Sequence, residues 1–269
     1  MMKLILILFP LCTWATCQLD SKFEYISLSA PVTSFFEQLQ ILNDTSLKVI
    51  SHFHPTKGFG GERWQGGIYL PVKKIRSIQA PTVLFFDQSQ ELRNLLNQEQ
   101  VSEKIQAVEI ATAQKPLATI FSELKEQLIP YLKNCSWQIK KLENQLAQAE
   151  VLYQQVEEKK DKVLFFLGEI KENQYPNKLV NNDLFVSELR KRNLFTAYPA
   201  DSAYVDWSAK ILGQFEAKWF VGLSDRCSKA EFKTEGQKLN FCHPRVFIPG
   251  IDQVEVMEKF LSQWQKVIH

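Results

Sequence analysis

The stretch SWQIKKLENQLAQAEVLYQQVEEKK, residues 136–160, contains no Gly or Pro, and the rest of the chain is arranged around it. Its apolar residues recur at spacings of three and four, which predicts one helix with an apolar face. That face consists of Ile139, Leu142, Leu146, Ala149, Leu152 and Val156. At 1.5 Å per residue the helix would span roughly 35 Å, about the width of a small domain. It predicts either a connection between two lobes or a long helix inside one domain.

The composition is that of a globular protein. A length of 269 residues is enough for two lobes of about 100–150 residues, each with its own core. The chain is 45% hydrophobic and carries 32 basic against 30 acidic residues, for a net charge of +2. A nucleic-acid-binding protein would concentrate basic residues on one face, so we expect no nucleic-acid partner.

Residues 1–17 have the plan of a secretory signal peptide. Lys3 precedes an apolar run, residues 4–11, and small residues follow. The run is too short to span a bilayer as a permanent helix. We expect cleavage after Cys17 and a soluble periplasmic protein. Lipidation of Cys17, which would anchor a lipoprotein, and a buried N-terminal strand are the alternatives.

Export would permit disulfides. Cys227 and Cys242 flank a polar, Lys-rich segment that has the pattern of a hairpin. Closing a loop of about 15 residues contributes roughly 3 kcal/mol in the chain-entropy model. We predict a Cys227–Cys242 disulfide and a free, buried Cys135. A zinc site that includes His243 is the alternative, but the paired ligand spacing of such sites is missing.

Strand and helix patterns alternate on both sides of residues 136–160. In the first half, residues 21–134, the sequence predicts strands at 23–29, 47–51, 82–86 and 108–110, and helices at 33–42, 72–78, 89–97 and 117–128. In the second half, residues 161–269, it predicts strands at 162–167, 195–198, 219–223 and 245–248, and helices at 182–192, 208–214 and 254–267. Short turns between strand, helix and strand are typical of parallel βαβ units. The sequence therefore favours two α/β lobes.

Six stretches, taken in order, are similar to one known family. They are FEYISLSAPVTSFFEQL (23–39), VISHFHP (49–55), WQGGIYLPVKKIRSIQAPTVLFF (64–86), KVLFFLGEIKENQYPNKLVNNDLFVSELRKRN (162–193), YVDWSAKILGQFEAKWFVGL (204–223) and HPRVFIPGIDQVEVMEKFLSQW (243–264). Their order resembles the substrate-binding proteins of bacterial ABC importers for cobalamin, haem and ferric siderophores. The resemblance implies two Rossmann-like lobes with mainly parallel sheets, joined by one long helix. It also implies a monomer that captures its ligand between the lobes and delivers it to a membrane permease.

The sequence departs from this family at two positions. Family members carry a Glu in a short helix of each lobe, and these acids meet arginines on the permease. Lys73 and Lys210 occupy the aligned positions. The reversed charge implies either a permease with acidic docking residues or a protein that serves no importer.

The resemblance places the ligand between the lobes, at the carboxyl ends of the strands. The residues expected there are His52, His54, Arg63, Trp64, Tyr69, Asp87, Tyr198, Tyr204, Trp207 and Arg226. The two histidines can turn both imidazoles toward one metal or haem iron, although two hydrogen-bonded loop histidines are the alternative. The arginines can pair with propionates or an anionic chelate. Aromatic faces hold flat macrocycles, and lobe core is the alternative for each aromatic residue.

Other functions find less support in the sequence. The segment GFGGERWQGG (58–67) lacks the Lys and Ser or Thr of a phosphate-binding loop, and the chain has no GxSxG, HExxH or CxxC motif. We therefore expect neither an enzyme nor a resident cofactor. Two other functions stay open for the same fold, a binder of bare metal ions and a scaffold that binds a partner without transporting a solute.

Overall fold

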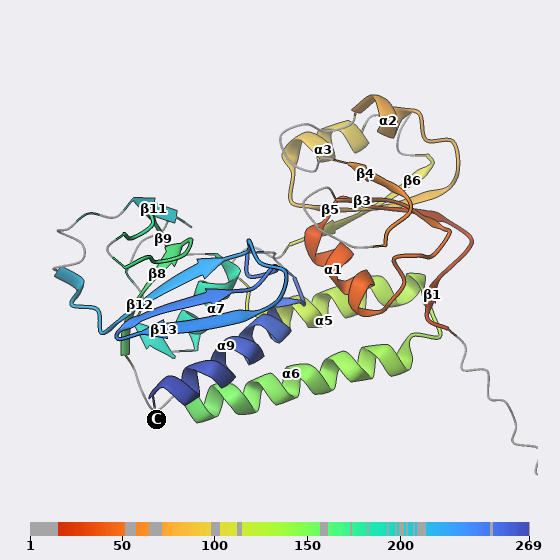
Figure 1. Cartoon of the computed structure of the whole chain (residues 1–269). Helices are drawn as coiled ribbons and strands as arrows, with labels where there is room; N and C mark the ends of the chain where they lie inside the picture. The colour runs from red at the N-terminus through yellow and green to blue at the C-terminus, as the bar shows by residue number, and fades with distance from the viewer. Residues whose placement is uncertain are drawn as a thin grey trace, which may run out of the picture.

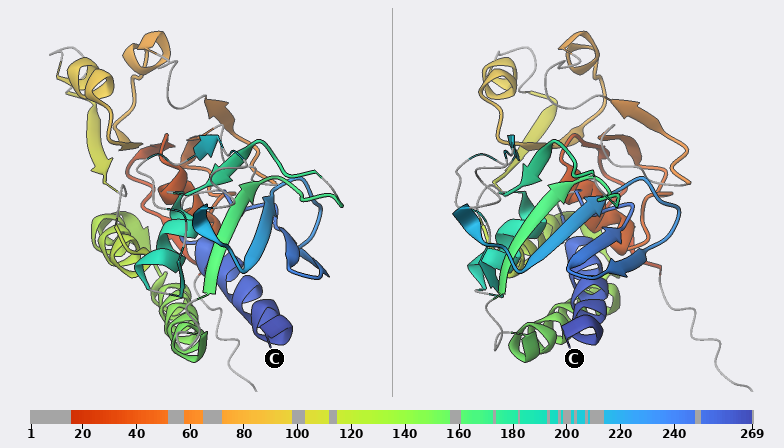
Figure 2. Two further views of the ribbon diagram at one scale, coloured as in Figure 1. Left: turned by 90° about the vertical axis from the view of Figure 1, so that its left-hand side faces the viewer. Right: turned by 60° about the vertical axis from the view of Figure 1, so that its left-hand side comes forward.

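The structure is a computed structural model that describes residues 16–51, 58–64, 72–97, 103–111, 115–156, 161–172, 174–181, 183–192, 194–196, 198, 202, 204–206, 208, 214–247 and 250–268. Two α/β lobes stand side by side above a long helix, α6 (Ser136–Val156), as predicted (Figure 1). The helix α9 (Gln253–Ile268) runs alongside α6 in both views of Figure 2. The expected continuation of α6 to residue 160 lies outside the described residues.

The N-terminal lobe contains a fully parallel sheet of five strands. Their order is β4 (Glu62–Trp64), β3 (Leu47–Ser51), β2 (Glu24–Ser27), β5 (Thr82–Asp87) and β6 (Ile105–Ile110). The central strand β5 is an apolar run because both of its faces are covered. Val83 and Phe85 pack toward α1 (Ala30–Gln38) and α5 (Leu117–Leu128), whereas Leu84 and Phe86 pack toward α2 (Val72–Arg76) and α3 (Gln90–Leu96).

The helix α1 begins at Ala30, earlier than the predicted residue 33. Ser29 is its N-cap, and the Ser29 hydroxyl accepts a hydrogen bond from the backbone N–H of Val32 at 3.4 Å. Pro31 lies in the first turn, where its missing N–H leaves no helical hydrogen bond unmade.

The C-terminal sheet is mixed rather than mainly parallel. Its order is β11 (Tyr204–Asp206), β9 (Lys178–Val180), β8 (Asp161–Leu167), β12 (Trp219–Ser224), β14 (Lys238–Cys242) and β13 (Glu231–Glu235), and β10 (Phe195–Thr196) also pairs with β8. The pairs β8–β12, β12–β14 and β8–β10 are parallel, whereas β9, β11 and β13 run antiparallel to their neighbours. The helix α7 (Leu184–Lys191) begins after its N-cap residue, Asp183.

The predicted strand at 245–248 is wrong, because residues 244–247 form turns. The hairpin of β13 and β14 takes that place beside β12. Gly236 forms its turn at φ +58°, and Leu239 and Phe241 turn inward at alternate positions of β14. Most of the helix predicted at 208–214 lies outside the described residues.

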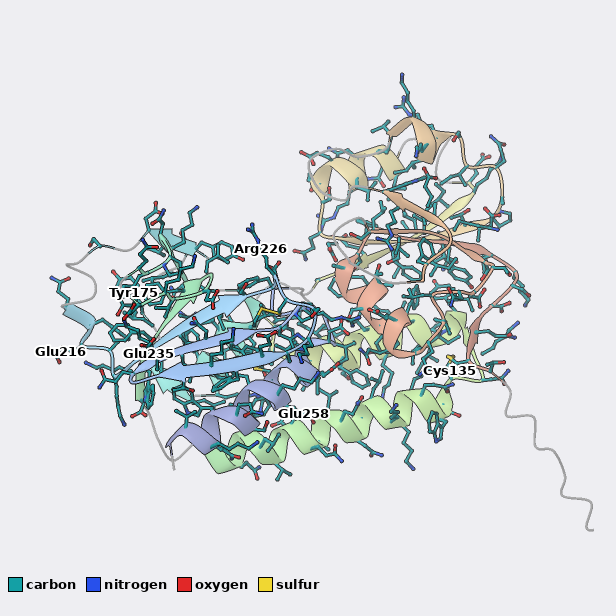
Figure 3. The ribbon with its side chains drawn as sticks, in the orientation of Figure 1. Cys135, Tyr175, Glu216, Arg226, Glu235 and Glu258 are labelled. Carbon is teal, nitrogen blue, oxygen red and sulfur yellow. A yellow bond between two sulfur atoms is a disulfide. The ribbon has the colours of Figure 1, made fainter. Side chains whose placement is uncertain are left out.

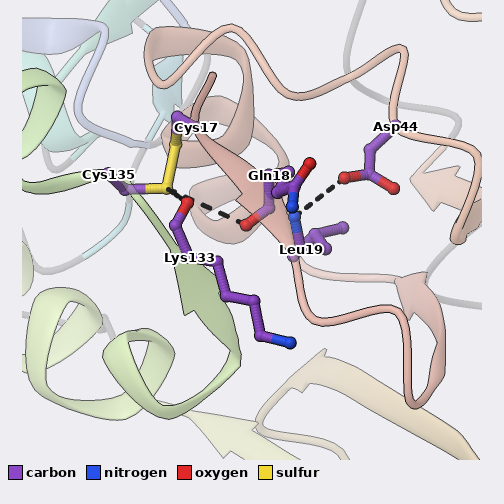
Figure 4. Close-up of a disulfide and its surroundings, with 6 residues drawn as sticks. All are labelled: Cys17, Gln18, Leu19, Asp44, Lys133 and Cys135. Atoms are coloured by element: carbon purple, nitrogen blue, oxygen red, sulfur yellow. Dashed lines mark hydrogen bonds between the residues drawn. A yellow bond between two sulfur atoms is a disulfide. The ribbon is translucent and has the colours of Figure 1, made fainter. Parts of the chain in front are cut away.

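A disulfide joins Cys17 to Cys135, with an S–S distance of 2.04 Å (Figure 4). Beside it, β1 (Gln18–Leu19) pairs antiparallel with β7 (Leu132–Lys133), and Leu19 N donates to Asp44 Oδ2 at 2.8 Å. Cys135 is buried as expected but is not free. The bridge uses the Cys17 sulfur, so it is incompatible with both cleavage after Cys17 and lipidation of Cys17. Residues 1–15 lie outside the described residues.

One arginine ties the two lobes together directly. The Arg245 guanidinium donates to Glu37 Oε1 on α1 at 2.6 Å and to Asp252 Oδ1 at 2.9 Å. Gln38 Nε2, also from α1, donates to Asp252 Oδ1 at 2.6 Å. The Asp252 side chain has 0% exposure, so these contacts neutralise a carboxylate that water does not reach.

Gly250 allows this close approach. Its φ is +153°, and a Cβ at this position would lie 2.8 Å from the side chain of Ser34 on α1. The Ser34 hydroxyl also accepts from Asp252 N at 3.3 Å. Buried apolar side chains continue from one lobe to the other in a single cluster, from Tyr25 on β2 to Trp264 on α9. The lobes therefore share one core along α6.

We expect Arg245→Gln to lower the free energy of unfolding by roughly 3–5 kcal/mol, because it leaves a buried carboxylate without its cation. Lys259→Gln is the matched control. It breaks the exposed Lys259–Glu255 pair and should cost less than about 1 kcal/mol. Urea unfolding followed by circular dichroism measures both losses. Equal losses would contradict the importance of the contact between lobes.

The Cys17–Cys135 bridge spans 118 residues, so its removal should destabilise the protein by roughly 4–5 kcal/mol in the chain-entropy model. We expect this loss for Cys17→Ser/Cys135→Ser in urea without reductant. Cys227→Ser/Cys242→Ser, which opens a separation of 15 residues, should lose about 3 kcal/mol. Detection of a free Cys135 thiol in the untreated protein would show that the first bridge does not form.

Candidate ligand-binding site

A hollow of about 680 Å³ lies at the carboxyl ends of β8 and β12. It falls within the range of roughly 300–1,000 Å³ that is typical of small-molecule sites. The segments that follow these two strands form one side of it, and the hairpin of β13 and β14 forms the other. The lining residues are Leu167, Gly168, Glu169, Gly222, Leu223, Ser224, Asp225, Arg226, Cys227, Glu231, Lys233, Asn240, Phe241, Cys242 and Phe247.

Two glycines and an asparagine build the floor of the hollow. Asn240 on β14 donates to the carbonyl of Ile170 at 2.8 Å and accepts from Ile170 N at 2.7 Å. The loop after β8 therefore lies flat across β12. Gly222 leaves room for it, since a Cβ there would lie 2.7 Å from the Gly168 carbonyl. Gly168 itself has φ +120°, a conformation that favours glycine.

The predicted Cys227–Cys242 disulfide is confirmed and lines the hollow. It joins the segment after β12 to the end of β14, at the point where the hairpin leaves the sheet. The zinc alternative that included His243 is wrong, because Cys227 and Cys242 are joined to each other. The bridge holds together two walls of the hollow that are 15 residues apart in sequence.

Charged side chains surround this floor. Glu169, Asp225 and Arg226 are exposed, and Glu231 pairs with Lys233 at 3.5 Å. Arg226 projects beyond the end of β12, on the side of its lobe that is nearer the N-terminal lobe (Figure 3). Its backbone N–H donates to the Ser224 hydroxyl at 3.2 Å, which fixes the turn that carries it.

Asp87 lies at the corresponding edge of the N-terminal sheet, at the end of β5. Ser29, which follows β2, donates its hydroxyl to Asp87 Oδ1 at 2.6 Å. Asp87 is exposed to solvent, yet protein crowds it closely enough that desolvation raises the pKa of its carboxyl. Both residues therefore lie at the carboxyl ends of parallel strands, and a ligand-binding role of Asp87 stays a prediction.

Tyr204 and Tyr198 have different surroundings. Tyr204 is 41% exposed on the edge strand β11, and its pKa is raised by burial and then by the carboxylates of Asp183 and Asp225. Tyr204 is not among the residues that line the hollow. Tyr198 is half-buried and packs edge-on against Phe215, with 6.0 Å between ring centroids, so the core alternative fits it better.

Trp64 does not have the position that its glycine-rich neighbours suggested. It is 7% exposed and packs in the core of the N-terminal lobe with Ile75 of α2, because β4 pairs with β3 and carries it there. Lys74 Nζ lies 5.3 Å from the centre of its ring. The neighbouring Arg63 is exposed on the sheet edge. The expectation that Trp64 faces a ligand is therefore wrong.

Five predicted positions, His52, His54, Tyr69, Trp207 and Lys210, lie outside the described residues. Lys73 is exposed on α2. The structure adds Glu231, Lys233, Asn240 and Phe247 to the candidate site, none of which the sequence indicated. For Glu231, Lys233 and Asn240 the signal in the sequence is the predicted disulfide, which brings the polar segment between its cysteines back to β12. Phe247 lies outside that segment and has no such signal.

Within the described ranges, no group of three or more His, Cys, Asp or Glu side chains is placed to hold a metal ion. In the same part of the chain, no helix combines the length and apolar character needed to cross a membrane.

No protein-family model matches the sequence, and no curated protein matches it either. Solved structures do match in fold. The haem-binding protein HutB of Vibrio cholerae is 13% identical with a TM-score of 0.61, and the match covers 91% of this chain and 99% of that one. The vitamin B12 binding protein BtuF of Vibrio cholerae is 12% identical (TM-score 0.60; 90% and 98%). The siderophore-binding protein FhuD of Vibrio cholerae, bound to ferric Desferal, is 14% identical (TM-score 0.59; 90% and 98%). The chain has the two-lobed fold of this class of binding proteins.

Asp183, the N-cap of α7, gives the stability of the C-terminal lobe a pH dependence that can be measured. It caps α7 by accepting from Val186 N at 2.9 Å, and burial raises its pKa from 3.8 to about 7. The folded chain thus favours the protonated carboxyl, whose stabilising contribution is full below pH 3.8 and is lost as the pH rises through 7.

Asp183→Asn keeps a capping oxygen without the charge. We expect it to match the wild type near pH 4 and to exceed its unfolding free energy by roughly 1–3 kcal/mol near pH 8.5. Urea unfolding at both pH values checks this. The expectation would be contradicted if the difference between the two proteins did not change with pH.

Proposed function

We propose that the protein is an exported, non-enzymatic solute-binding protein that captures a bulky ligand between its lobes for an ABC importer. An iron chelate, haem or cobalamin is the proposed ligand. The hollow of about 680 Å³ at the carboxyl ends of β8 and β12 carries this proposal. The fold supports it, since the proteins named above bind haem, vitamin B12 or a ferric siderophore.

Capture would need little movement of the lobes. Arg245 ties α1 to the C-terminal lobe, and the shared core continues along α6. A stiff helix with direct contacts between lobes makes a poor wide hinge, in contrast to two or three flexible strands. The walls of the cleft would therefore stand close to their bound positions before the ligand arrives, which reduces the entropy lost on binding.

Delivery would use a basic surface on the N-terminal lobe. Lys73, Lys74 and Arg76 are exposed on α2, and Lys74 pairs with Glu62. Such a surface complements acidic residues on a permease. The same basic surface also supports a second candidate function, that of a scaffold of this fold that binds an acidic partner and transports no solute.

Export would follow from the apolar run at residues 4–11. The Cys17–Cys135 bridge needs Cys17 in the mature protein, so signal cleavage would occur before this residue.

Titration of the purified protein with haemin, cyanocobalamin and ferric siderophores tests the proposal through absorption spectra and tryptophan fluorescence. We expect saturable binding of one ligand at a 1:1 ratio. Ser224→Trp, which places a bulky ring in the hollow, should weaken that binding at least tenfold. Ser21→Trp introduces the same ring at an exposed position of the other lobe and should change nothing.

Two results would count against a solute-binding role. The first is no binding of any of these ligands. The second is binding that Ser224→Trp leaves unchanged, since the ligand would then lie elsewhere. Binding of a bare divalent ion alone would instead support the metal-ion alternative.

A further inference from the structure

The two disulfides in the described part of the chain differ in their surroundings. Cys17 and Cys135 are 8% and 4% exposed and belong to the main cluster of buried residues. Cys227 and Cys242 are half-buried, and both line the hollow. A reagent in solution can therefore approach the second bridge through the hollow, whereas protein covers the first.

Cys227 lies in an exposed segment without helix or strand. The strand β12 ends at Ser224, and β13 begins at Glu231. Of the six residues between them, 225–230, all except Cys227 are exposed. The hydrogen bond from Arg226 N to the Ser224 hydroxyl lies before the cysteine, at the start of the segment. The disulfide ties the segment to the end of β14.

Cys242, in contrast, lies in a ladder that does not depend on the disulfide. Its strand β14 pairs with β12 on one side and with β13 on the other, and each ladder extends along the whole of β14. His243 N also donates to the carbonyl of Ser224 at 2.9 Å. Breaking the disulfide would therefore release residues 225–230 and leave the hairpin in place.

We propose that the Cys227–Cys242 disulfide is a site of thiol–disulfide exchange, which a dithiol reaches through the hollow, and that its reduction frees one wall of the hollow. Exposed disulfides are more easily reduced than buried ones. The Cys17–Cys135 bridge would stay oxidised because its sulfurs are covered. The freed segment carries Asp225 and Arg226, so reduction would release two charged side chains of the lining from fixed positions.

The exchange takes two steps. A thiolate of the dithiol attacks Cys227 Sγ, in the exposed segment, and a mixed disulfide forms. The S–S bond between the cysteines breaks, and its electron pair goes to Cys242 Sγ, which takes up a proton. The second thiol of the reagent then attacks the mixed disulfide and releases Cys227 as a thiol. The two cysteines are thereby reduced, and the dithiol is oxidised to a disulfide.

Reduction of the full, folded protein with dithiothreitol tests the site. Samples taken over time are blocked with iodoacetamide, and peptide mass spectrometry identifies the free thiols. We expect Cys227 and Cys242 to be labelled at least tenfold faster than Cys135. Glutathione, a monothiol, allows the mixed disulfide to be trapped, and it should be found on Cys227.

Trypsin tests the release of the wall, after the thiols have been blocked and the reductant removed. Cleavage after Arg226 and Lys229, both exposed, should be at least tenfold faster in the reduced protein. Cleavage after Lys73, exposed in the other lobe, should not change.

Two double variants serve as matched controls. Cys227→Ser/Cys242→Ser should be cleaved at the fast rate without reductant and should not respond to it. Cys17→Ser/Cys135→Ser should keep the slow rate until reductant is added.

Four results would overturn the proposal in whole or in part. Labelling of Cys135 as fast as Cys227, or no labelling before the protein unfolds, overturns the exchange site. Glutathione on Cys242 overturns the order of attack. Unchanged trypsin cleavage after reduction overturns the release of the wall. None of these measurements needs a ligand, so their outcome is independent of the proposed solute-binding function.

Discussion

The contact between Arg245, Glu37 and Asp252 is the constraint on which the rest of the structure depends. Asp252 has no exposed side-chain surface, so the guanidinium cannot leave without stranding a charge in a poorly hydrated environment. Glu37 belongs to the other lobe, so the hydrogen bond from Arg245 to Glu37 also holds the two lobes together. Phe247, two residues after Arg245, lines the hollow. The Arg245 contact therefore also holds in place the segment that contributes Phe247 to the candidate site.

The floor of the hollow is likewise held in place by a small number of contacts. Asn240 satisfies both backbone groups of Ile170, and Gly222 provides the space beneath. Neither residue offers a charged group to a ligand, yet together they hold the loop that carries Glu169. A disulfide then fixes the opposite wall. Binding surfaces fixed in this way lose little conformational entropy when a ligand arrives, so affinity depends mainly on how well the charges match.

Local patterns predicted the fold well where the determining interactions are local. The strand β5 is a continuous apolar run, and α5 occupies its predicted residues, where apolar side chains recur with helical periodicity. Trp64 shows the limit, since its place in the core depends on pairing between β4 and β3, which glycine-rich neighbours do not reveal. The disulfide of Cys135 escapes prediction for a related reason. Its partner lies 118 residues away, in a segment that has the plan of a cleaved signal peptide. The candidate site was predicted in outline, at the carboxyl ends of the strands, but the hairpin wall depends on long-range pairing.

The Cys17–Cys135 bridge has a further consequence. It encloses the whole N-terminal sheet, and α6 begins at the very next residue, Ser136. The N-terminal lobe is thus a covalent ring, whereas the only part of the described second lobe that a disulfide closes is residues 227–242. A single cut in a loop of the ring would leave its pieces attached, whereas a cut in the second lobe outside residues 227–242 would leave no disulfide between its pieces. The two halves of one fold therefore differ in how they withstand proteases, although both are α/β lobes.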